Sequence, residues 1–312
     1  MRRSQLVLLA LAVAAVSTAG PLIREADAPA LAVAAWRNLL AVGALGVFVA
    51  GRRRPEPLDA PTRRQVVLAG VLLAGHFATW VPSVQMTTVS SSVALVCTTP
   101  VWTALLARLR GELVTRREWI GIAVAIAGVL VLSGVDLSVS RRALAGDALA
   151  LAGGILAAGY LVVGAGIRRT VSTTVYTFGC YGVAGVLLAA ATGAAGDRLA
   201  GFDGRTWLVL LAMAAGPQLL GHSLFNRVLP EVGTTVVSVA ILLEVLGASL
   251  LAWWWSGETP PVAAIPAAAF LLGGVTLVAT ANSGARTSAA SPGSPATLAT
   301  PPRRPPSRSG SA

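Results

Sequence analysis

The chain contains no lysine, because all 24 of its basic residues are arginine. Without lysine the phosphate-binding motif Gly-x-x-x-x-Gly-Lys cannot form, so the chain has no ATPase module of this kind. The metalloprotease motif His-Glu-x-x-His and the hydrolase motif Gly-x-Ser-x-Gly are also missing. The loops between apolar segments are too short for a soluble catalytic domain. We therefore predict that the protein is not an enzyme.

Charge is scarce, since only 12% of the residues are charged while 55% are hydrophobic, and the mean hydropathy is +0.73. A water-soluble surface cannot be covered with so few charges, whereas a surface that faces lipid needs almost none. The formal net charge of +11 does not indicate a nucleic-acid partner, because the arginines lie in short loops and tails without interleaved aromatic residues. Composition thus predicts a protein embedded in a lipid bilayer.

Metal-binding side chains are also few. The two cysteines, Cys97 and Cys180, lie in apolar runs without a Cys-x-x-Cys motif, which predicts buried, unreactive thiols. The two histidines, His76 and His222, have no third ligand at a suitable spacing. We predict no metal site and no cofactor.

The apolar residues fall into ten segments, each close to the roughly 20 residues that a membrane-spanning helix requires. The first segment follows Met1-Arg2-Arg3 and resembles a signal peptide, but we predict a retained helix because the repeat described below needs it. The sequence thus predicts an all-α, polytopic membrane protein of ten helices, at residues 5–23, 28–50, 66–86, 88–109, 118–135, 147–167, 174–194, 207–229, 233–255 and 262–281.

The distribution of arginine predicts the orientation. With a cytoplasmic N-terminus, 18 arginines fall on the cytoplasmic side and 5 in the outer loops, and Arg37 lies within a span. The positive-inside rule therefore predicts that both termini are cytoplasmic, as an even number of spans requires. The lack of lysine fits a high-GC bacterial genome, so we predict a multi-pass protein of the bacterial cell (inner) membrane. Residues 284–312, rich in Ser, Pro, Ala, Thr and Arg, are predicted to form a disordered cytoplasmic tail.

An internal repeat divides the chain. Three landmarks recur 146 residues apart: Gly75-His76 with Gly221-His222, Thr88 with Thr234, and Gly111-Glu112 with Gly257-Glu258. The repeat predicts two five-helix halves, 1–142 and 143–283. Because five is odd, the second half enters the membrane upside down relative to the first. Such inverted repeats are common in secondary transporters, whose solute site lies near the midplane between the halves.

Several motifs carry a family resemblance, which covers about residues 1–282. In the second half these are Leu220-Gly221-His222-Ser223-Leu224-Phe225-Asn226, Gly233-Thr234-Thr235-Val236-Val237-Ser238 and Leu243-Glu244. In the first half they are Ala35-Trp36-Arg37-Asn38, Ser90-Ser91-Ser92-Val93-Ala94-Leu95 and Thr99-Pro100-Val101-Trp102. With these motifs the chain resembles the EamA-like branch of the drug/metabolite transporter superfamily.

The resemblance implies ten helices in two inverted repeats around a central cavity that opens alternately to each side. It also implies export or exchange of amino acids, metabolites or drug-like compounds. The chain departs from the family in its ninth helix, where it reads Glu244-Val245-Leu246 and family members commonly carry Glu-Pro-Val. A proline kink is therefore not predicted there, whereas Pro100 is kept in the first half.

Two charged residues fall near the middle of predicted spans, Arg37 and Glu244. A charge within the bilayer costs about 3 kcal/mol on insertion scales, so both are candidate solute-binding residues. Arg37 is suited to an anionic group, and Glu244 to a cationic group or a coupling proton. The alternative is structural: the two residues pair with each other or with polar neighbours.

Further candidates for the solute site are polar or aromatic residues within the spans. His76 and His222 occupy matched positions in the two halves, and histidine titrates near neutral pH, so a proton relay is open. The remaining candidates are Trp80, Tyr160, Gln218 and Asn226. Tyr176 and Tyr181 are interpreted instead as anchors at the membrane–water interface.

Secondary transport of a small solute is the function that the sequence favours, with lipid and a solute as partners. The alternatives are an intramembrane enzyme and a non-transporting membrane scaffold or sensor. The sequence leaves open the substrate, the oligomeric state, and the choice between proton antiport and facilitated diffusion.

Overall fold

The computed structural model describes residues 1–51, 57–87, 89–133, 140–256 and 264–290, and within these ranges every regular element is helical. The landmarks Thr88, Gly257 and Glu258 lie outside the described residues. The helices are α1 (Arg3–Val16), α2 (Ala19–Glu25), α3 (Ala30–Ala50), α4 (Ala60–Met86), α5 (Val89–Val96), α6 (Thr99–Leu109), α7 (Arg116–Ser133), α8 (Arg141–Ile167), α9 (Thr173–Ala194), α10 (Gly204–Met213), the π-helix η1 (Ala214–His222), α11 (Ser223–Val232), α12 (Thr234–Ile241), α13 (Leu243–Ser256) and α14 (Ala264–Ala290).

Within the described ranges, eight helical stretches are long and apolar enough to cross a membrane, which confirms a polytopic, helical membrane protein. They are Arg3–Glu25, Ala30–Ala50, Ala60–Met86, Ser91–Leu109, Arg141–Ile167, Thr173–Ala194, Gly204–Val232 and Thr234–Trp255, and a shorter apolar helix covers Ile265–Val278. The total of ten spans stays a prediction. Helix α14 continues past the predicted end of its span, so the predicted tail at 284–312 begins inside this helix.

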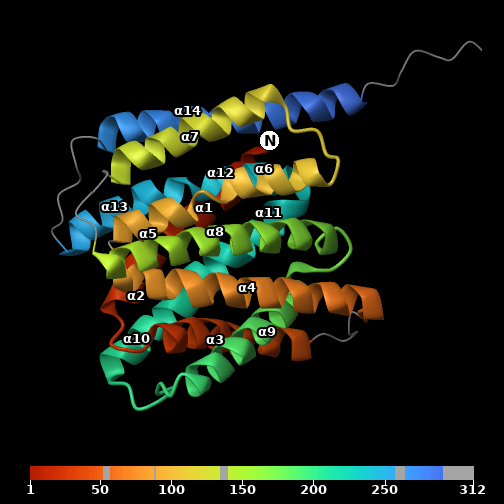
Figure 1. Ribbon diagram of the computed structural model, residues 1–312. Helices are drawn as coiled ribbons and strands as arrows, with labels where there is room; N and C mark the ends of the chain where they lie inside the picture. The colour runs from red at the N-terminus through yellow and green to blue at the C-terminus, as the bar shows by residue number, and fades with distance from the viewer. Residues whose placement is uncertain (52–56, 88, 134–139, 257–263, 291–312) are drawn as a thin grey trace, which may run out of the picture.

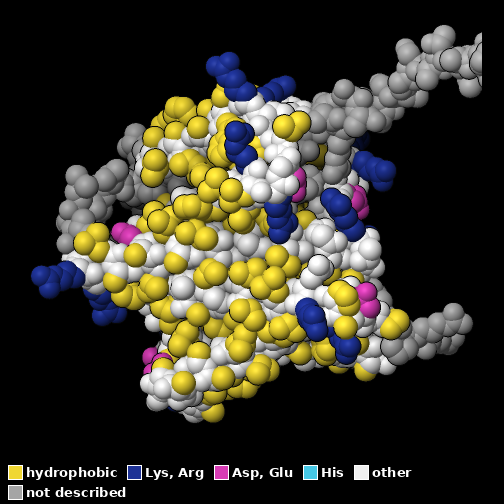
Figure 2. Space-filling model, turned by 45° about the vertical axis from the view of Figure 1, so that its right-hand side comes forward, with side chains coloured by type: hydrophobic (Ala, Val, Ile, Leu, Met, Phe, Trp, Pro, Cys, Tyr) yellow, Lys and Arg dark blue, Asp and Glu magenta, His cyan; other side chains and the backbone are white. Residues whose placement is uncertain are grey.

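The helices lie side by side and run across Figure 1. The connections from α6 to α7 and from α8 to α9 lie at one end of the bundle, and those from α2 to α3 and from α9 to α10 lie at the other. Hydrophobic side chains cover most of the flank in Figure 2. Large apolar residues of the bundle are strongly exposed, Val47 by 73% and Leu208 by 68%, as expected of a surface that contacts lipid.

Within the bundle, spans of the first predicted half pack against spans of the second. Helix α4 packs along α8 and α9, while the stretch formed by α10, η1 and α11 packs on α1 and α3. Helices α3 and α9 contact each other, and so do α7 and α14. The third predicted span thus contacts the sixth and seventh, and the eighth contacts the first and second.

Two matched caps start the third and eighth spans. The side chain of Asp59 accepts a hydrogen bond from the backbone N–H of Thr62 at 2.9 Å, and Asp203 accepts one from Thr206 at 2.9 Å. Hydrogen bonds from the threonine side chain and, next, from its backbone N–H stabilise each carboxylate and lower the pKa of both Asp59 and Asp203 below the ordinary value of 3.8. Both spans therefore begin with the pattern Asp-x-x-Thr.

The π-helix accounts for a difference in length between these two spans. The Asp caps lie 144 residues apart, whereas His76 and His222 lie 146 apart, so the second half has two extra residues in between. A π-helix fits more residues into each turn than an α-helix. The nine residues of η1 therefore absorb the insertion without displacing His222 along the span.

Candidate solute site

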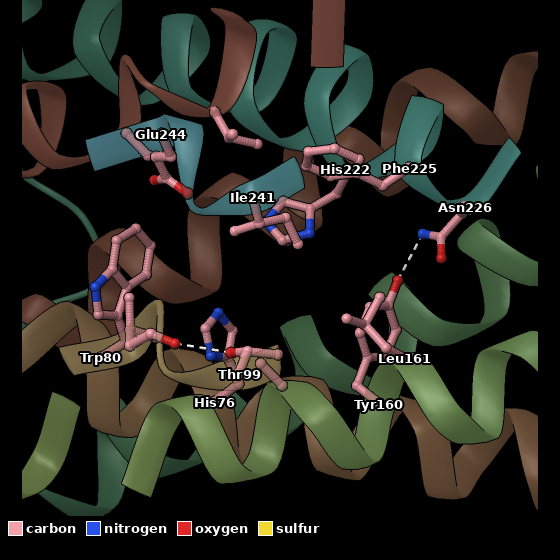
Figure 3. A pocket seen from close by; sticks show the side chains of 14 residues that line it. His76, Trp80, Thr99, Tyr160, Leu161, His222, Phe225, Asn226, Ile241 and Glu244 are labelled. Carbon is pink, nitrogen blue, oxygen red and sulfur yellow. Dashed lines mark hydrogen bonds between the residues drawn. The ribbon is translucent and has the colours of Figure 1, made fainter. Parts of the chain in front are cut away.

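A buried cavity lies among the interrupted helices in the interior of the bundle (Figure 3). Its volume is about 50 Å³, which is room for a few water molecules. Its wall comes from α1, α2, α4, α5, α6, α8, α11, α12 and α13 and from the end of η1, and so from both predicted halves. The wall includes six of the predicted candidates: His76, Trp80, Tyr160, His222, Asn226 and Glu244.

Two spans of the wall, α5–α6 and α12–α13, are interrupted beside the cavity by the same kind of tight turn. Between α5 and α6, the N–H of Thr98 bonds to Leu95 O at 3.1 Å and that of Val101 bonds to Thr98 O at 3.0 Å. Between α12 and α13, Leu242 bonds to Val239 O at 3.1 Å and Val245 to Leu242 O at 3.2 Å. Each pair of bonds spans three residues and tightens the helix into a 3₁₀-like turn.

The interruption at Leu242 occurs without a proline. Since Val245 donates to Leu242, the carbonyl of Ile241 is released from the helix, and the thiol of Cys97 donates to it at 3.8 Å. The two interruptions therefore contact each other. The sequence predicted no proline kink in the ninth span, and the interruption found there does not depend on a proline.

A glycine lets helix α8 approach the first interruption. A Cβ atom at Gly154 would lie 2.9 Å from the carbonyl oxygen of Val96, closer than side-chain carbons normally come. The hydroxyl of Thr99 also donates to Gly154 O at 3.3 Å. The small residue thereby allows the backbone of α8 to form one wall of the cavity.

Glu244 is the charged residue of the cavity wall. It lies in the first turn of α13, next to the interruption at Leu242, and only 6% of the residue is exposed. Figure 3 shows its carboxyl group near Trp80 and Ile241. A buried carboxylate requires a partner of opposite charge, a proton or strong hydrogen-bond donors.

The two histidines extend from opposite helices into the cavity (Figure 3). His76 Nδ1 lies 3.0 Å from the carbonyl oxygen of Gly153 in α8. Because a carbonyl only accepts, Nδ1 carries a hydrogen, and in the neutral ring Nε2 is then an acceptor. The ring of His76 stacks on Trp80, with centroids 5.6 Å apart.

A polar pair occupies another part of the wall. Asn226 Nδ2 donates to the hydroxyl of Tyr160 at 2.6 Å, and the ring of Tyr160 stacks on that of Tyr176 at 6.3 Å. Two buried polar atoms of the wall have no hydrogen-bond partner within the described chain, namely Asn226 Oδ1 and Trp80 Nε1. Buried polar groups are normally satisfied, so these two atoms are exceptions, and both become available to a ligand only if the cavity widens.

Arg37 and Gln218, the other two candidates, are not part of the cavity wall. Arg37 Nε donates to Gln218 Oε1 at 2.9 Å, and Gln218 Nε2 donates to Asn38 Oδ1 at 3.0 Å. The guanidinium lies 4.2 Å above the ring of Phe77, which also contacts the edge of His222. Both Nη atoms of this fully buried arginine lack a partner in the described part of the chain.

The sequence analysis missed several residues of this region. Asn38 holds Gln218, and Phe77 contacts both Arg37 and His222. Tyr176 and Tyr181 are fully buried, so their interpretation as interface anchors is wrong. The motif Ala35-Trp36-Arg37-Asn38 was the signal that could have found the asparagine. Which way the aromatic side chains face depends on the rotation of each helix about its axis, and a uniformly apolar span has no periodicity that defines this rotation.

A second cavity, of about 250 Å³, lies at the end of the bundle that holds the connections from α6 to α7 and from α8 to α9. Its wall includes Arg110, Glu112 and Arg169. Both cavities are bordered by α8 and α11, and the bond between Tyr160 and Asn226 lies on these same two helices.

A bundle of lipid-exposed helices around a largely apolar cavity with a few polar groups defines a polytopic membrane protein with a candidate solute site. The chain belongs to the EamA-like transporter family, whose model matches residues 3–134 and 144–280, so the predicted family is confirmed. Members of this family are membrane transporters of small solutes, not enzymes.

One solved structure, titled "Crystal structure of protein", is similar with a TM-score of 0.74 and 18% identity, covering 91% of this chain and 99% of that chain. At this identity the similarity concerns the fold. None of the curated proteins compared matches the chain.

Proposed function

We propose that this protein is a secondary transporter that moves a small metabolite, amino acid or drug-like solute across the bacterial inner membrane by alternating access, as an exporter or exchanger. The observation that supports this best is the buried cavity, whose wall combines helices of both halves and includes Glu244. A carboxyl group deep in a membrane protein is costly, and its usual justification is a solute or ion pathway.

The proposed inverted halves, 1–142 and 143–283, agree with the packing. A pseudo-twofold axis exchanges the third span with the eighth and the sixth with the first. The third span contacts the sixth, and the eighth contacts the first, so the axis maps one contact onto the other. The same axis relates the interruption at Thr98 to that at Leu242, and these two meet at the cavity. Discontinuous helices at the interface of two repeats are typical of secondary transporters.

The two cavities suggest the path of the solute. The central cavity is too small for a metabolite and must widen to bind one, whereas the second cavity is larger and lies at the proposed cytoplasmic end. We propose that the Tyr160–Asn226 pair separates them in this conformation. The backbone carbonyl of Asn226 is held as well, because Arg168 Nε donates to it at 3.0 Å.

Solute flux in proteoliposomes tests the proposal. A mixture of metabolites, amino acids and amphipathic drugs is loaded outside vesicles that contain the purified full chain, and uptake is measured with and without a proton gradient. We expect uptake of at least one solute, lost in Glu244→Gln. Asp197→Asn, which removes an exposed loop carboxylate, is the matched control and should transport normally.

Coupling is tested in the same vesicles. Proton antiport predicts that an imposed proton gradient accelerates flux through the unmodified protein, whereas facilitated diffusion predicts no response to the gradient. Absence of saturable flux for every solute, together with a specific protein partner, would support a scaffold or sensor instead.

A further inference from the structure

Several hydrogen-bond acceptors lie in the cavity wall. Glu244 contributes a carboxyl group, and Asn226 contributes Oδ1, which has no partner among the described residues. His76 contributes Nε2, because its Nδ1–H is used by Gly153. The wall also holds neutral groups that can donate, namely the hydroxyl of Tyr160, a ring N–H of His222 and the indole N–H of Trp80.

The only formal charge of this wall, within the described residues, is that of Glu244. Arg37 interacts with Glu244 electrostatically, but its terminal nitrogens have no partner among the described residues, so the two side chains do not form an ion pair. Arg37 is held away from the wall by its bond to Gln218 and by its contact with Phe77. A ligand in the cavity therefore touches a carboxyl group and no cation.

Most of the remaining wall is apolar. Leu161, Phe225 and Ile241 lie between the acceptor groups in Figure 3. A ligand that fills this space needs an apolar body, and the acceptors require N–H donors on it.

From this arrangement we infer that the solute is an organic monocation: an apolar body that carries one protonated amine or guanidine group, with its N–H donors directed to Glu244, His76 and Asn226. The inference rests on the proposed transport function and names the class of its substrate. An anion would place two like charges together in a medium of low dielectric constant, which costs several kcal/mol. A neutral solute would offer the carboxyl group hydrogen bonds alone, whereas a protonated amine or guanidine offers both hydrogen bonds and the opposite charge.

Three probes of similar shape test the class: benzylguanidinium, benzylurea and 3-phenylpropanoate. A guanidinium stays protonated at neutral pH, and the urea replaces it without the charge. Binding to the purified full chain in detergent is measured by isothermal titration calorimetry. We expect benzylguanidinium to bind about tenfold or more tightly than benzylurea, since a charge-assisted hydrogen bond contributes more than a neutral one, and 3-phenylpropanoate not to bind.

Substitutions at Glu244 locate the preference. Glu244→Gln should bind benzylguanidinium and benzylurea about equally, and retained binding of benzylurea shows that the variant is folded. Glu244→Asp keeps the charge and should keep the preference, as should the exposed control Asp197→Asn. Equal binding of the first two probes by the unmodified protein, preference for 3-phenylpropanoate, or no binding of any probe would each overturn the inference.

Flux separates this inference from the proposed function. If vesicles transport a neutral or anionic solute while benzylguanidinium does not bind, the protein is a transporter of another substrate class. If benzylguanidinium binds through Glu244 but no solute of any class crosses the membrane, the cation site stands and transport is refuted.

Discussion

At the scale of single residues, the costliest group in the molecule is the guanidinium of Arg37, which is fully buried yet hydrogen-bonded through Nε alone among the described residues. Its stacking on Phe77 compensates in part, because a desolvated cation above an aromatic face is stabilised by about 2 kcal/mol. The bond to Gln218 is thus the main polar support of this charge.

Removing that support should destabilise the fold. We expect Gln218→Leu to lower the free energy of unfolding by about 1–3 kcal/mol, because it leaves a buried charge without its side-chain partner. The double variant Arg37→Leu, Gln218→Leu should be more stable than the single one, since both polar partners are then gone. Thermal unfolding in detergent measures both. Additive losses in the double variant would contradict the view that the two residues support each other.

The helix caps Asp59 and Asp203 predict a pH dependence. Their folded-state pKa values lie below 3.8, so the stability they contribute is present above that pH and is lost as the pH falls through the lower folded values. Asparagine caps a helix without titrating. The variant Asp59→Asn, Asp203→Asn should therefore unfold like the unmodified protein at pH 7 and lose less stability on acidification to pH 2. Identical acid profiles would contradict this assignment.

At the scale of helices, the sequence predicted the existence and approximate position of the elements but not their interruptions. Uniformly apolar segments define a span by length alone, and the tight turn at Leu242 has no proline or glycine to mark it. The π-helix η1 could not be predicted from the sequence either, because its only trace is that the distance from the Asp cap to the histidine is two residues longer in the second half. These local departures from α-geometry depend on contacts between spans, such as that of Cys97 with Ile241.

The pairing of α8 with α11 predicts a gate. If the Tyr160–Asn226 bond separates the two cavities, Tyr160→Phe should weaken the barrier while keeping the ring stacked on Tyr176. In a Cys97→Ala, Cys180→Ala background, a reporter cysteine at Ile241 should then react several-fold faster with a membrane-impermeant thiol reagent. The increase should occur only from the side of the second cavity.

Thr192→Val, which removes a hydroxyl bonded to Leu188 away from both cavities, is the control. An equal increase from both sides, or none, would refute the gate.

At the scale of the whole molecule, composition was sufficient for the fold class, since so few charges leave a bilayer as the only suitable solvent. The position of polar residues within apolar spans was informative too: six of the eight candidates lie on the cavity wall, because such groups gather where lipid is absent. It could not distinguish wall residues from those behind them. Arg37 and Gln218 satisfy the same rule but bond to each other, and only the rotation of α3 and the π-helix shows it.

The proposed inverted arrangement predicts that the matched caps lie on opposite sides of the membrane. Asp59 and Asp203 start equivalent spans, so in an inverted repeat the residues after them lie on opposite sides of the membrane. Ala60 and Gly204 are both exposed, and nothing lies within 4 Å of a Cβ atom placed at Gly204. Single cysteines at these two positions, in the Cys97→Ala, Cys180→Ala background, should therefore be tolerated.

Labelling of intact bacteria with a membrane-impermeant maleimide reads out the side. Gly204→Cys should react in intact cells, because the arginine distribution places that connection outside, and Ala60→Cys should react only after permeabilisation. The comparison needs no knowledge of the substrate, and it tests the architecture separately from transport. Reaction of both cysteines from one side would mean that the halves insert in parallel, and an axis in the membrane plane could then not relate the two interruptions that meet beside Glu244.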